Sequence, residues 1–319
     1  MSNDESIPRV SLGLPVYNGQ NYLAEAIESL LAQDFSDFEL LIVDNASIDA
    51  TAQISAAFVE RDARVRYFRN ERNVGAAANF NRAFLHSRAP YFKWCAHDDL
   101  HSANYVSEMV EILDRDPDCV IAYPRVDMID EFGRPTGRVW LTLGDMRDMS
   151  PASRFGLMIA SQGWDGVLFG LWRRSAMERT LLQASYYGSD CALLAEMSLL
   201  GSFVPAATAK LFNRDHPERA MNLHYSERGT WQDTRKQSRR ALEISNRIVN
   251  LMQIAWRHRA VAPFYRTLPS LLGWALRPHQ SGRVLLEAVG FVSPTARSVL
   301  RSAVGRVIQP RRTATPSQR

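Results

Sequence analysis

The chain has 319 residues, of which 46% are hydrophobic and 23% are charged. This composition is typical of a folded globular protein and excludes a disordered tail, a collagen-like fibre and a small disulfide-rich scaffold. The three cysteines include no Cys-x-x-Cys pair, which favours a reducing compartment and supplies no zinc framework. Because the sequence has no apolar run of about 18 residues and no secretory pattern at its start, we expect a cytoplasmic protein without a membrane span.

The net charge of +4 is an average over two unlike parts of the chain. Residues 251–319 contain 11 arginines and one glutamate, a net charge of +10, which leaves −6 for residues 1–250. An acidic body argues against nucleic-acid binding. Within the basic segment, residues 296–308 predict an amphipathic helix, which could lie on the inner face of the cell membrane or pack on the body or in a homodimer.

Strand-like and helix-like segments alternate through the first 125 residues. Such alternation implies right-handed crossovers and a mostly parallel sheet with helices on both faces. Ligands of these sheets bind outside the carboxyl ends of the strands. We predict strands at 10–16, 38–43, 65–68, 91–95 and 120–123, and helices at 21–32, 49–61, 79–87 and 103–113.

Regularity falls after residue 125, where glycine and proline interrupt residues 133–151. From about residue 225 the chain is predicted to be mainly helical. Between these two parts we predict a helix at 152–161, a strand at 167–172, a helix at 189–200 and a strand at 203–212.

Polar residues follow several of the predicted strands. Pro15–Asn18 and Asp44–Ser47 end the first two strands, and both segments could equally be ordinary turns. Arg72–Gly75 precedes the polar start of a helix that contains Asn79 and Asn81. Backbone N–H groups there could contact an anion, or the side chains could simply cap the helix.

An acidic pair follows the strand YFKWC, in the sequence Ala96-His97-Asp98-Asp99. Adjacent carboxylates repel one another, and a divalent cation with oxygen ligands is the usual compensation. A solvated turn is the alternative.

The segments PVYNG, LLIVDNASIDAT, RNERNVGAAANFN and YFKWCAHDDL stand in the order and spacing of family 2 glycosyltransferases. The sequence resembles that family over about residues 8–220. The resemblance implies a GT-A fold: an α/β architecture with a Rossmann-like, mostly parallel central sheet flanked by helices, followed here by a helical C-terminal extension. It divides the chain into a catalytic domain at 1–220, with a nucleotide-sugar half at about 8–125 and an acceptor half at about 126–220, and a basic helical region at 221–319.

The resemblance also implies roles for residues of the first half. Pro15 and Tyr17 would border the base, and Asp44 would accept a hydrogen bond from its N3–H. The acidic pair falls on the family's DxD-type motif, which binds ribose and Mg²⁺ or Mn²⁺. Many members have Asp-x-Asp-Asp, whereas this chain has alanine at position 96, so we assign Asp99 to the metal and Asp98 toward the ribose. The full nucleotide-binding set is Pro15, Val16, Tyr17, Asn18, Asp44, Asn45, Asn73, Gly75 and Asp98.

In the second half, Asp190 is either the N-cap of the predicted helix, together with Ser189, or the general base that the family places there. Asp165 is the alternative base, and we place it with Trp164 at the acceptor. His216 lies in a segment that resembles the family's Arg-x-His and would join Asp98 and Asp99 at the metal. The residues assigned to the donor phosphate or sugar are Asn79, Arg82, Arg214 and Arg219.

We therefore predict a glycosyltransferase that moves a sugar from a UDP-, dTDP- or GDP-sugar to the hydroxyl of a saccharide or lipid-linked glycan, as in polysaccharide or glycolipid biosynthesis. The resemblance implies inversion and dependence on Mg²⁺ or Mn²⁺. The alternatives are a catalytically impaired nucleotide-sugar-binding protein and a sugar-phosphate nucleotidyltransferase, although the turn GLPVYNGQN lacks the Gly-rich, cationic loop that the latter class needs. A dinucleotide oxidoreductase would need GxGxxG there, which is absent.

Overall fold

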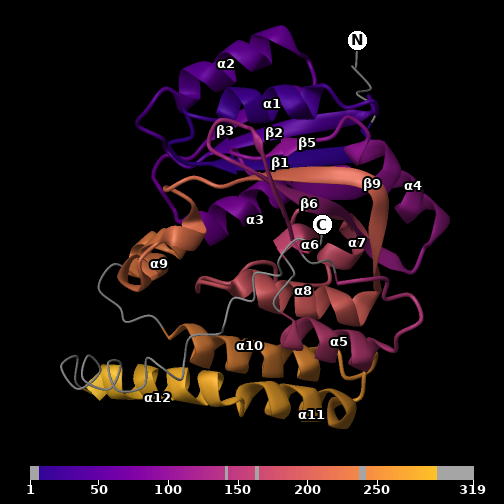
Figure 1. The fold of residues 1–319 in the computed structure, drawn as a ribbon, viewed down its shortest axis with the longest axis vertical. Coiled ribbons are helices and arrows are strands. Elements are labelled where there is room, and N and C mark those ends of the chain that lie inside the picture. Colours follow the sequence, from indigo (N-terminus) through magenta and orange to yellow (C-terminus); the bar gives the residue numbers. More distant parts are fainter. Residues whose placement is uncertain (1–6, 141–142, 162–164, 237–241, 293–319) are drawn as a thin grey trace.

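The computed structural model describes residues 7–140, 143–161, 165–236 and 242–292. Within these ranges nine strands form one sheet, and helices cover both of its faces (Figure 1). The α/β fold class predicted from the sequence is confirmed.

The first half of the sheet is parallel, in the strand order β3-β2-β1-β4. Its strands and the helices that connect them alternate along the chain as the sequence predicts. They are β1 (Val10–Val16), α1 (Leu23–Leu31), β2 (Phe38–Asp44), α2 (Thr51–Arg61), β3 (Val65–Arg69), α3 (Ala76–His86) and β4 (Tyr91–Trp94).

The second half of the sheet mixes both directions. Strand β8 (Leu171–Arg173) is antiparallel to its neighbours β4 and β6 (Cys119–Ile129), while β6 is parallel to β9 (Ser202–Arg214). Two further antiparallel strands flank this half, β5 (Leu100–His101) beside β9 and β7 (Pro135–Val139) beside β6. The parallel arrangement expected from the first 125 residues is thus concentrated in β3-β2-β1-β4.

The strand predicted at 167–172 is wrong in its first part. The chain forms the short helix α6 (Asp165–Leu168), turns at Gly170, and becomes a strand only at β8. A side chain at Gly170 would meet the carbonyl oxygen of Ala122 at 2.5 Å, so glycine is needed for this close approach to β6. A short apolar run does not reveal from its periodicity whether it is helix or strand.

Two hydrophobic cores lie on the two faces of the sheet. Residues of α1 and of α4 (Tyr105–Arg115) pack with alternate residues of β1 on one face. On the other face Trp94 and Trp172 meet edge to face, with ring centroids 5.3 Å apart, in a core shared with α3 and α8 (Ser189–Leu200). Since both faces of β1 are covered, all its residues are buried.

Three C-terminal helices complete the second core: α10 (Glu243–Arg257), α11 (Phe264–Ala275) and α12 (Pro278–Val292). They form the lower layers in Figure 1, where α10 packs on α8, and α11 on α5 (Pro151–Ala160). Buried Leu251 and Trp274 belong to the same core as Trp94. A buried pair, His258 Nε2 and Glu196 Oε1 at 2.8 Å, links the end of α10 to α8.

The N-terminus of α10 is held by α12. The carboxylate of Glu287 accepts hydrogen bonds from the backbone N–H groups of Ile244 at 2.8 Å and Ser245 at 3.0 Å. These two groups have no partner within their own helix, so Glu287 serves as their cap. The amphipathic helix predicted at 296–308 lies outside the described residues, and none of the described helices is long and apolar enough to cross a bilayer.

Candidate active site

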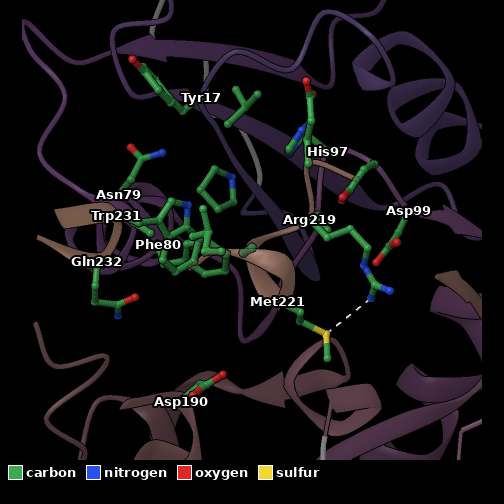
Figure 2. A pocket seen from close by; sticks show the side chains of 18 of the residues that line it. Tyr17, Asn79, Phe80, His97, Asp99, Asp190, Arg219, Met221, Trp231 and Gln232 are labelled. Carbon is green, nitrogen blue, oxygen red and sulfur yellow. Dashed lines mark hydrogen bonds between the residues drawn. The ribbon is translucent and has the colours of Figure 1, made fainter. Parts of the chain in front are cut away.

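A cavity of about 1260 Å³ opens at the carboxyl ends of β1, β2 and β4. Two sets of residues face each other across it, as Figure 2 shows for Tyr17 and Asp190. We call residues 15–22, 45, 73–79 and 96–99 the strand-end wall, and residues 187–190, 227–234 and 247 the helical wall. The helical wall comes from α8, α9 (Tyr225–Gln232) and α10.

The two loops that follow β1 and β2 are tied together by backbone and side-chain hydrogen bonds. The N–H of Asn18 donates to Ser47 Oγ at 2.9 Å, and its Oδ1 accepts from the N–H of Ile48 at 3.0 Å. Asn18 has a φ of 52°, a left-handed conformation that asparagine tolerates better than most residues. These turn residues hold Pro15, Val16, Tyr17 and Asn18 in the cavity lining, where the prediction placed them.

An amide network supports the same wall. Buried Asn45 accepts hydrogen bonds from Asn70 Nδ2 at 2.9 Å and the N–H of Val74 at 3.0 Å, and donates to Asn73 Oδ1 at 2.9 Å. Asn79 continues the network by accepting from Asn70 at 2.8 Å. Asn45, Asn73 and Asn79 all line the cavity, in agreement with their predicted positions.

Three predicted residues, Asp44, Gly75 and Arg82, do not belong to the cavity lining. Asp44 is fully buried, and its carboxylate accepts hydrogen bonds from the Tyr67 hydroxyl at 2.6 Å and the N–H of Ser47 at 2.8 Å. Burial, reinforced by that carboxylate, raises the pKa of Tyr67 to about 12. Arg82 contacts Asn70 of the amide network.

Gly75 is the third of these residues, and its role in the structure is steric. It precedes α3 with a φ of 87°, and an added Cβ would lie 2.6 Å from the carbonyl oxygen of Gln232. The glycine therefore lets the strand-end wall touch the helical wall.

The acidic pair lies at the other end of the strand-end wall. Asp99 is 1% exposed and accepts hydrogen bonds from the N–H of Arg214 at 2.9 Å and from Asn213 Nδ2 at 3.0 Å. Burial and the charge of Asp98 raise the pKa of Asp99 to about 7. Although burial acts in the opposite direction, the charge of His97 and the hydrogen bond from His216 lower the pKa of Asp98.

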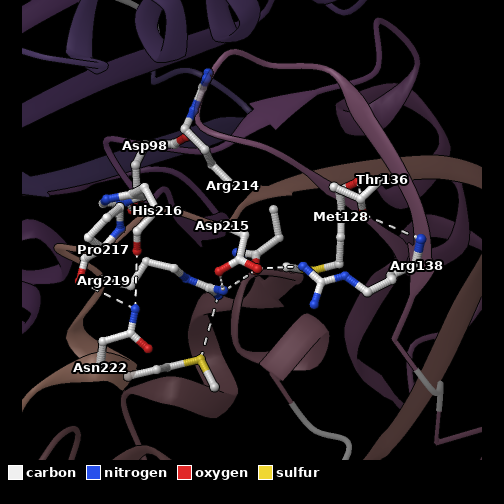
Figure 3. Close-up of polar contacts among 12 residues, drawn as sticks. Asp98, Met128, Thr136, Arg138, Arg214, Asp215, His216, Pro217, Arg219 and Asn222 are labelled. Carbon is white, nitrogen blue, oxygen red and sulfur yellow. Dashed lines mark hydrogen bonds and ion pairs between the residues drawn. The ribbon is translucent and has the colours of Figure 1, made fainter. Parts of the chain in front are cut away.

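His216 joins this pair through its side chain, with Nε2 2.9 Å from Asp98 Oδ2 (Figure 3). Asp98, Asp99 and His216, the three residues predicted to hold the metal, thus line one end of the cavity together. The described residues contain no group of three or more acidic, histidine or cysteine side chains already arranged as a metal cage. The donor set nevertheless fits Mg²⁺ or Mn²⁺, because two carboxylates and an imidazole are present, and because a cation would offset both the burial of Asp99 and its repulsion by Asp98, which together raise its pKa.

The two arginines assigned to the donor differ in their surroundings. Arg214 is 1% exposed and lies outside the lining, where its guanidinium donates to the Asp98 carbonyl at 2.8 Å and to Glu25 at 2.6 Å. Arg219 lines the cavity and donates to Asn213 Oδ1 at 2.6 Å. Arg219 is therefore the one of the two with access to a bound ligand, and Arg214 supports the acidic loop.

Asp190 faces the cavity from the first turn of α8. The N-cap predicted for Ser189 or Asp190 is wrong, because Gly188, with a φ of 85°, occupies that position and no side chain caps the helix. The Asp190 carboxylate accepts a hydrogen bond from the N–H of Cys191 at 2.9 Å and from the Cys191 thiol at 3.6 Å. Burial raises the pKa of Asp190, and the charge of Arg247 opposes the rise.

The predicted acceptor residues are only partly described. Trp164 lies outside the described residues, and Asp165 is described only as the first residue of α6. The neighbouring residues of that helix, Gly166 and Leu168, line the cavity.

Sequence reasoning missed several lining residues, including Tyr22, His97, Tyr187, Trp231 and Arg247. For Arg247 a signal existed. It lies three residues after Ile244 and four before Leu251, on the stripe of α10 that faces the core. An arginine at such a position indicates a polar site beneath the helix.

Comparison with known proteins assigns the chain to a family. The model of glycosyl transferase family 2 matches residues 11–174, so the chain belongs to that family. An uncharacterised glycosyltransferase of Rickettsia typhi is 35% identical over 41% of this chain and 40% of its own length. The putative glycosyltransferase EpsE of Bacillus subtilis is 29% identical over 41% of this chain and 48% of its own. The chain thus matches less than half the length of these relatives.

Solved structures show the same fold. S. aureus TarS 1–349, in complex with UDP-GlcNAc, aligns with a TM-score of 0.56 and 15% identity over 94% of this chain and 88% of its own. GalNAc-T7, with UDP, GalNAc and Mn²⁺, aligns with a TM-score of 0.52 and 12% identity over 67% of this chain and 45% of its own. These likenesses confirm the GT-A architecture.

Proposed function

We propose that this protein transfers a glycosyl group from a nucleotide diphosphate sugar to the hydroxyl of a saccharide or lipid-linked acceptor. The observation that carries the proposal is the presence of Asp190 and the Asp98–Asp99 pair in one cavity. Membership of glycosyl transferase family 2 supports it, as do the structural neighbours, which were solved with UDP, UDP-GlcNAc or UDP and Mn²⁺.

In this proposal the strand-end wall binds the nucleotide. Tyr17 is 43% exposed at the cavity and offers a ring face to the base, while the amide network holds the surrounding loops in place. Asp98, Asp99 and His216 would hold Mg²⁺ or Mn²⁺. When bound, that ion supplies positive charge against the departing diphosphate.

Asp190 is the proposed general base. A carboxylate with a raised pKa accepts a proton more readily than one of ordinary pKa, and general bases work best when their pKa approaches the working pH. Asp190 would take the proton of the acceptor hydroxyl as its oxygen attacks the anomeric carbon and the bond to the nucleotide diphosphate breaks. Because one displacement inverts the anomeric centre, we propose an inverting transferase.

Two other functions are separable by experiment. A catalytically impaired nucleotide-sugar-binding protein is suggested by Ala96, which stands where many relatives have an acid. A sugar-phosphate nucleotidyltransferase would need a glycine-rich cationic loop after β1, and that loop contains no arginine or lysine between Val10 and Asp34.

The test is a thermal-shift screen of UDP-, dTDP- and GDP-sugars with and without Mn²⁺, followed by measurement of sugar release. A donor that binds the folded protein raises its melting temperature as RT ln(1 + [L]/Kd). We expect one base to be preferred, a larger shift with Mn²⁺, and slow hydrolysis of the bound donor. Binding without any hydrolysis or transfer would favour the impaired protein, and release of diphosphate from a nucleoside triphosphate would favour the nucleotidyltransferase.

The metal assignment has its own control. We expect D99N to lose the Mn²⁺-dependent part of the donor shift, while D148N, which changes an exposed carboxylate outside the cavity, should keep it. Full activity in excess EDTA would contradict the metal assignment.

We also propose that the basic C-terminal segment brings the enzyme to the inner face of the cell membrane or into a homodimer. The support is its net charge of +10 after residue 250. A chain ending at Val292 would retain Glu287 and the cap of α10, so it should keep donor binding but lose sedimentation with anionic vesicles. A parallel measurement of its mass in solution tests the dimer.

A further inference from the structure

Arg247 lies on the core-facing stripe of α10 and makes no hydrogen bond or ion pair with the described residues, although the charges of Asp190 and Glu243 act on it. Its Nε is buried and has no hydrogen-bond partner among the described residues. No described carboxylate lies within ion-pair distance of its guanidinium. The nearby Glu243 is instead paired with Arg283, at 3.1 Å.

The guanidinium lies beside the turn that presents Asp190. A Cβ added to Gly188 would lie only 2.0 Å from Arg247 Nη2, so the side chain packs directly on the residue that caps α8. Both Arg247 and Asp190 line the cavity, and the charge of Arg247 lowers the pKa of Asp190 against the effect of burial. The Arg247 guanidinium and the proposed base Asp190 therefore lie in the same part of the cavity.

An unpaired arginine in such a position is costly. The guanidinium stays charged at any physiological pH, and a buried donor without a partner loses its hydration and gains nothing in return. Its planar set of donors matches a carboxylate or phosphate in a two-pronged contact. A bound anion would accept the hydrogen bond from Arg247 Nε that no described residue accepts.

The donor diphosphate is not the best candidate for that anion. Arg219 and Asp99, the proposed metal ligand, lie away from Asp190 in Figure 2, whereas Arg247 packs against Gly188, two residues before Asp190. The group that enters next to the general base is the acceptor.

Resting on the function proposed above, we propose that the acceptor is anionic, and that Arg247 binds its phosphate or carboxylate beside the hydroxyl that Asp190 deprotonates. Such acceptors are sugar phosphates or phosphodiester-linked glycans on the one hand and uronic acids on the other. The shared chemistry is an oxyanion within one sugar unit of the attacking hydroxyl.

The test uses the full-length protein saturated with Mn²⁺ and the nucleotide selected by the donor screen. Glucose 6-phosphate, glucuronic acid and glucose are titrated into it by calorimetry. We expect at least one anionic probe to bind about tenfold or more tightly than glucose, as one charged hydrogen-bonded contact would provide. Preference for the phosphate or for the carboxylate identifies the source of the oxyanion.

R247Q should remove this difference and leave the affinity for the nucleotide unchanged. R247K, which keeps the charge but loses the planar fork, should retain part of it, and R257Q, at an exposed arginine of the same helix, should retain all of it. Because Arg247 makes no hydrogen bond or ion pair with the described residues, and burial opposes the favourable charges of Asp190 and Glu243, R247Q should melt close to the temperature of the unaltered protein.

Equal binding of all three probes to the unaltered protein, or an undiminished preference in R247Q, would overturn the proposal. A lower melting temperature with equal weakening of every probe would assign Arg247 a structural role and also overturn it. If the nucleotide screen finds no donor, the proposed function fails instead, and the two failures are therefore distinguishable.

Discussion

The two walls of the cavity differ in how their polar groups are satisfied. In the strand-end wall, Asn18, Asn45 and Asn73 bond to one another's loops. In the helical wall, Asp190 accepts one backbone N–H and Arg247 has an unpaired Nε. The amide network of the first wall is satisfied by the protein itself, and the acidic pair at its end is left for a cation, whereas Asp190 and Arg247 of the second wall carry charges that a substrate could complete.

This difference suggests that the two walls have different functions, nucleotide binding for the first and acceptor selection for the second. A wall whose hydrogen bonds are internal keeps its shape before the ligand arrives, which suits a nucleotide that every reaction cycle uses. A wall with unsatisfied charges gains stability only when its substrate is present, which suits selection of an acceptor. Four predictions test the division, from the largest expected effect to the smallest.

The strongest test is D190N in the helical wall. Loss of a general base should lower turnover by about 10²- to 10⁴-fold. Donor affinity and melting temperature should stay near those of the unaltered protein, because Asp190 supports no other element. Steady-state kinetics and donor titration measure both quantities, with D148N as the matched exposed control. If D190N were active, another residue would have to be the general base, and Asp165 is the next candidate.

The pH dependence of turnover is a second test of Asp190 in the helical wall. Burial raises the pKa of Asp190, Arg247 of α10 opposes this, and Cys191 and Tyr186 are its other titratable neighbours. A base works only when deprotonated, so kcat should fall about tenfold per pH unit as the pH drops below that raised pKa. Measured at saturating donor and Mn²⁺, a kcat that stays flat down to the ordinary range of aspartate would contradict the assignment. In R247Q the acid limb should move to higher pH.

In the strand-end wall, N45A should reduce stability more than catalysis. Asn45 is 3% exposed, and its removal leaves the N–H of Val74 and the amide of Asn70 without their partner. We expect a cost of about 1–3 kcal/mol, measured by urea unfolding. N246A is the control, since that side chain on α10 makes no hydrogen bond among the described residues. If R247Q proved more destabilising than N45A, the contrast between the walls would be wrong.

The smallest expected effect is that of G188A. Alanine at a φ of 85° costs about 1 kcal/mol, which lowers the melting temperature of a protein of this size by about 1–2 °C. G144A is a matched control, because Gly144 has a φ of 80° and open space around it. Both variants should lose similar stability. Only G188A should lower the affinity for the acceptor, because the added Cβ at position 188 displaces the Arg247 side chain. Equal KM values for the acceptor in the two variants would contradict the contact between position 188 and Arg247.

Much of the strand-end wall could be predicted from the sequence. Strand ends followed by Pro, Asn, Asp and Gly are local signals, and in a parallel sheet they meet at one edge. The family and the fold class are confirmed, and α8 begins and ends where the apolar pattern of residues 189–200 predicts. The roles of the individual site residues remain predictions.

The helical wall was harder to predict because it depends on contacts between distant segments. Arg247 and Trp231 reach the cavity only because α10 packs on α8 and α9 packs on α3. The N-cap of α8 was misassigned for a related reason. Gly188 takes a left-handed conformation against Arg247, 59 positions later in the chain, and no local pattern reports that contact.

Glu287 of α12 has a consequence for the smallest active piece of this enzyme. Its carboxylate closes the N-terminus of α10, one turn before Arg247. A chain cut near residue 220 would keep every strand of the sheet but lose Arg247, and one cut before residue 287 would keep Arg247 on a helix with a frayed start. The shortest fragment able to choose its acceptor therefore extends almost to the end of the described chain, and the C-terminal helices are as much a part of the active enzyme as the sheet.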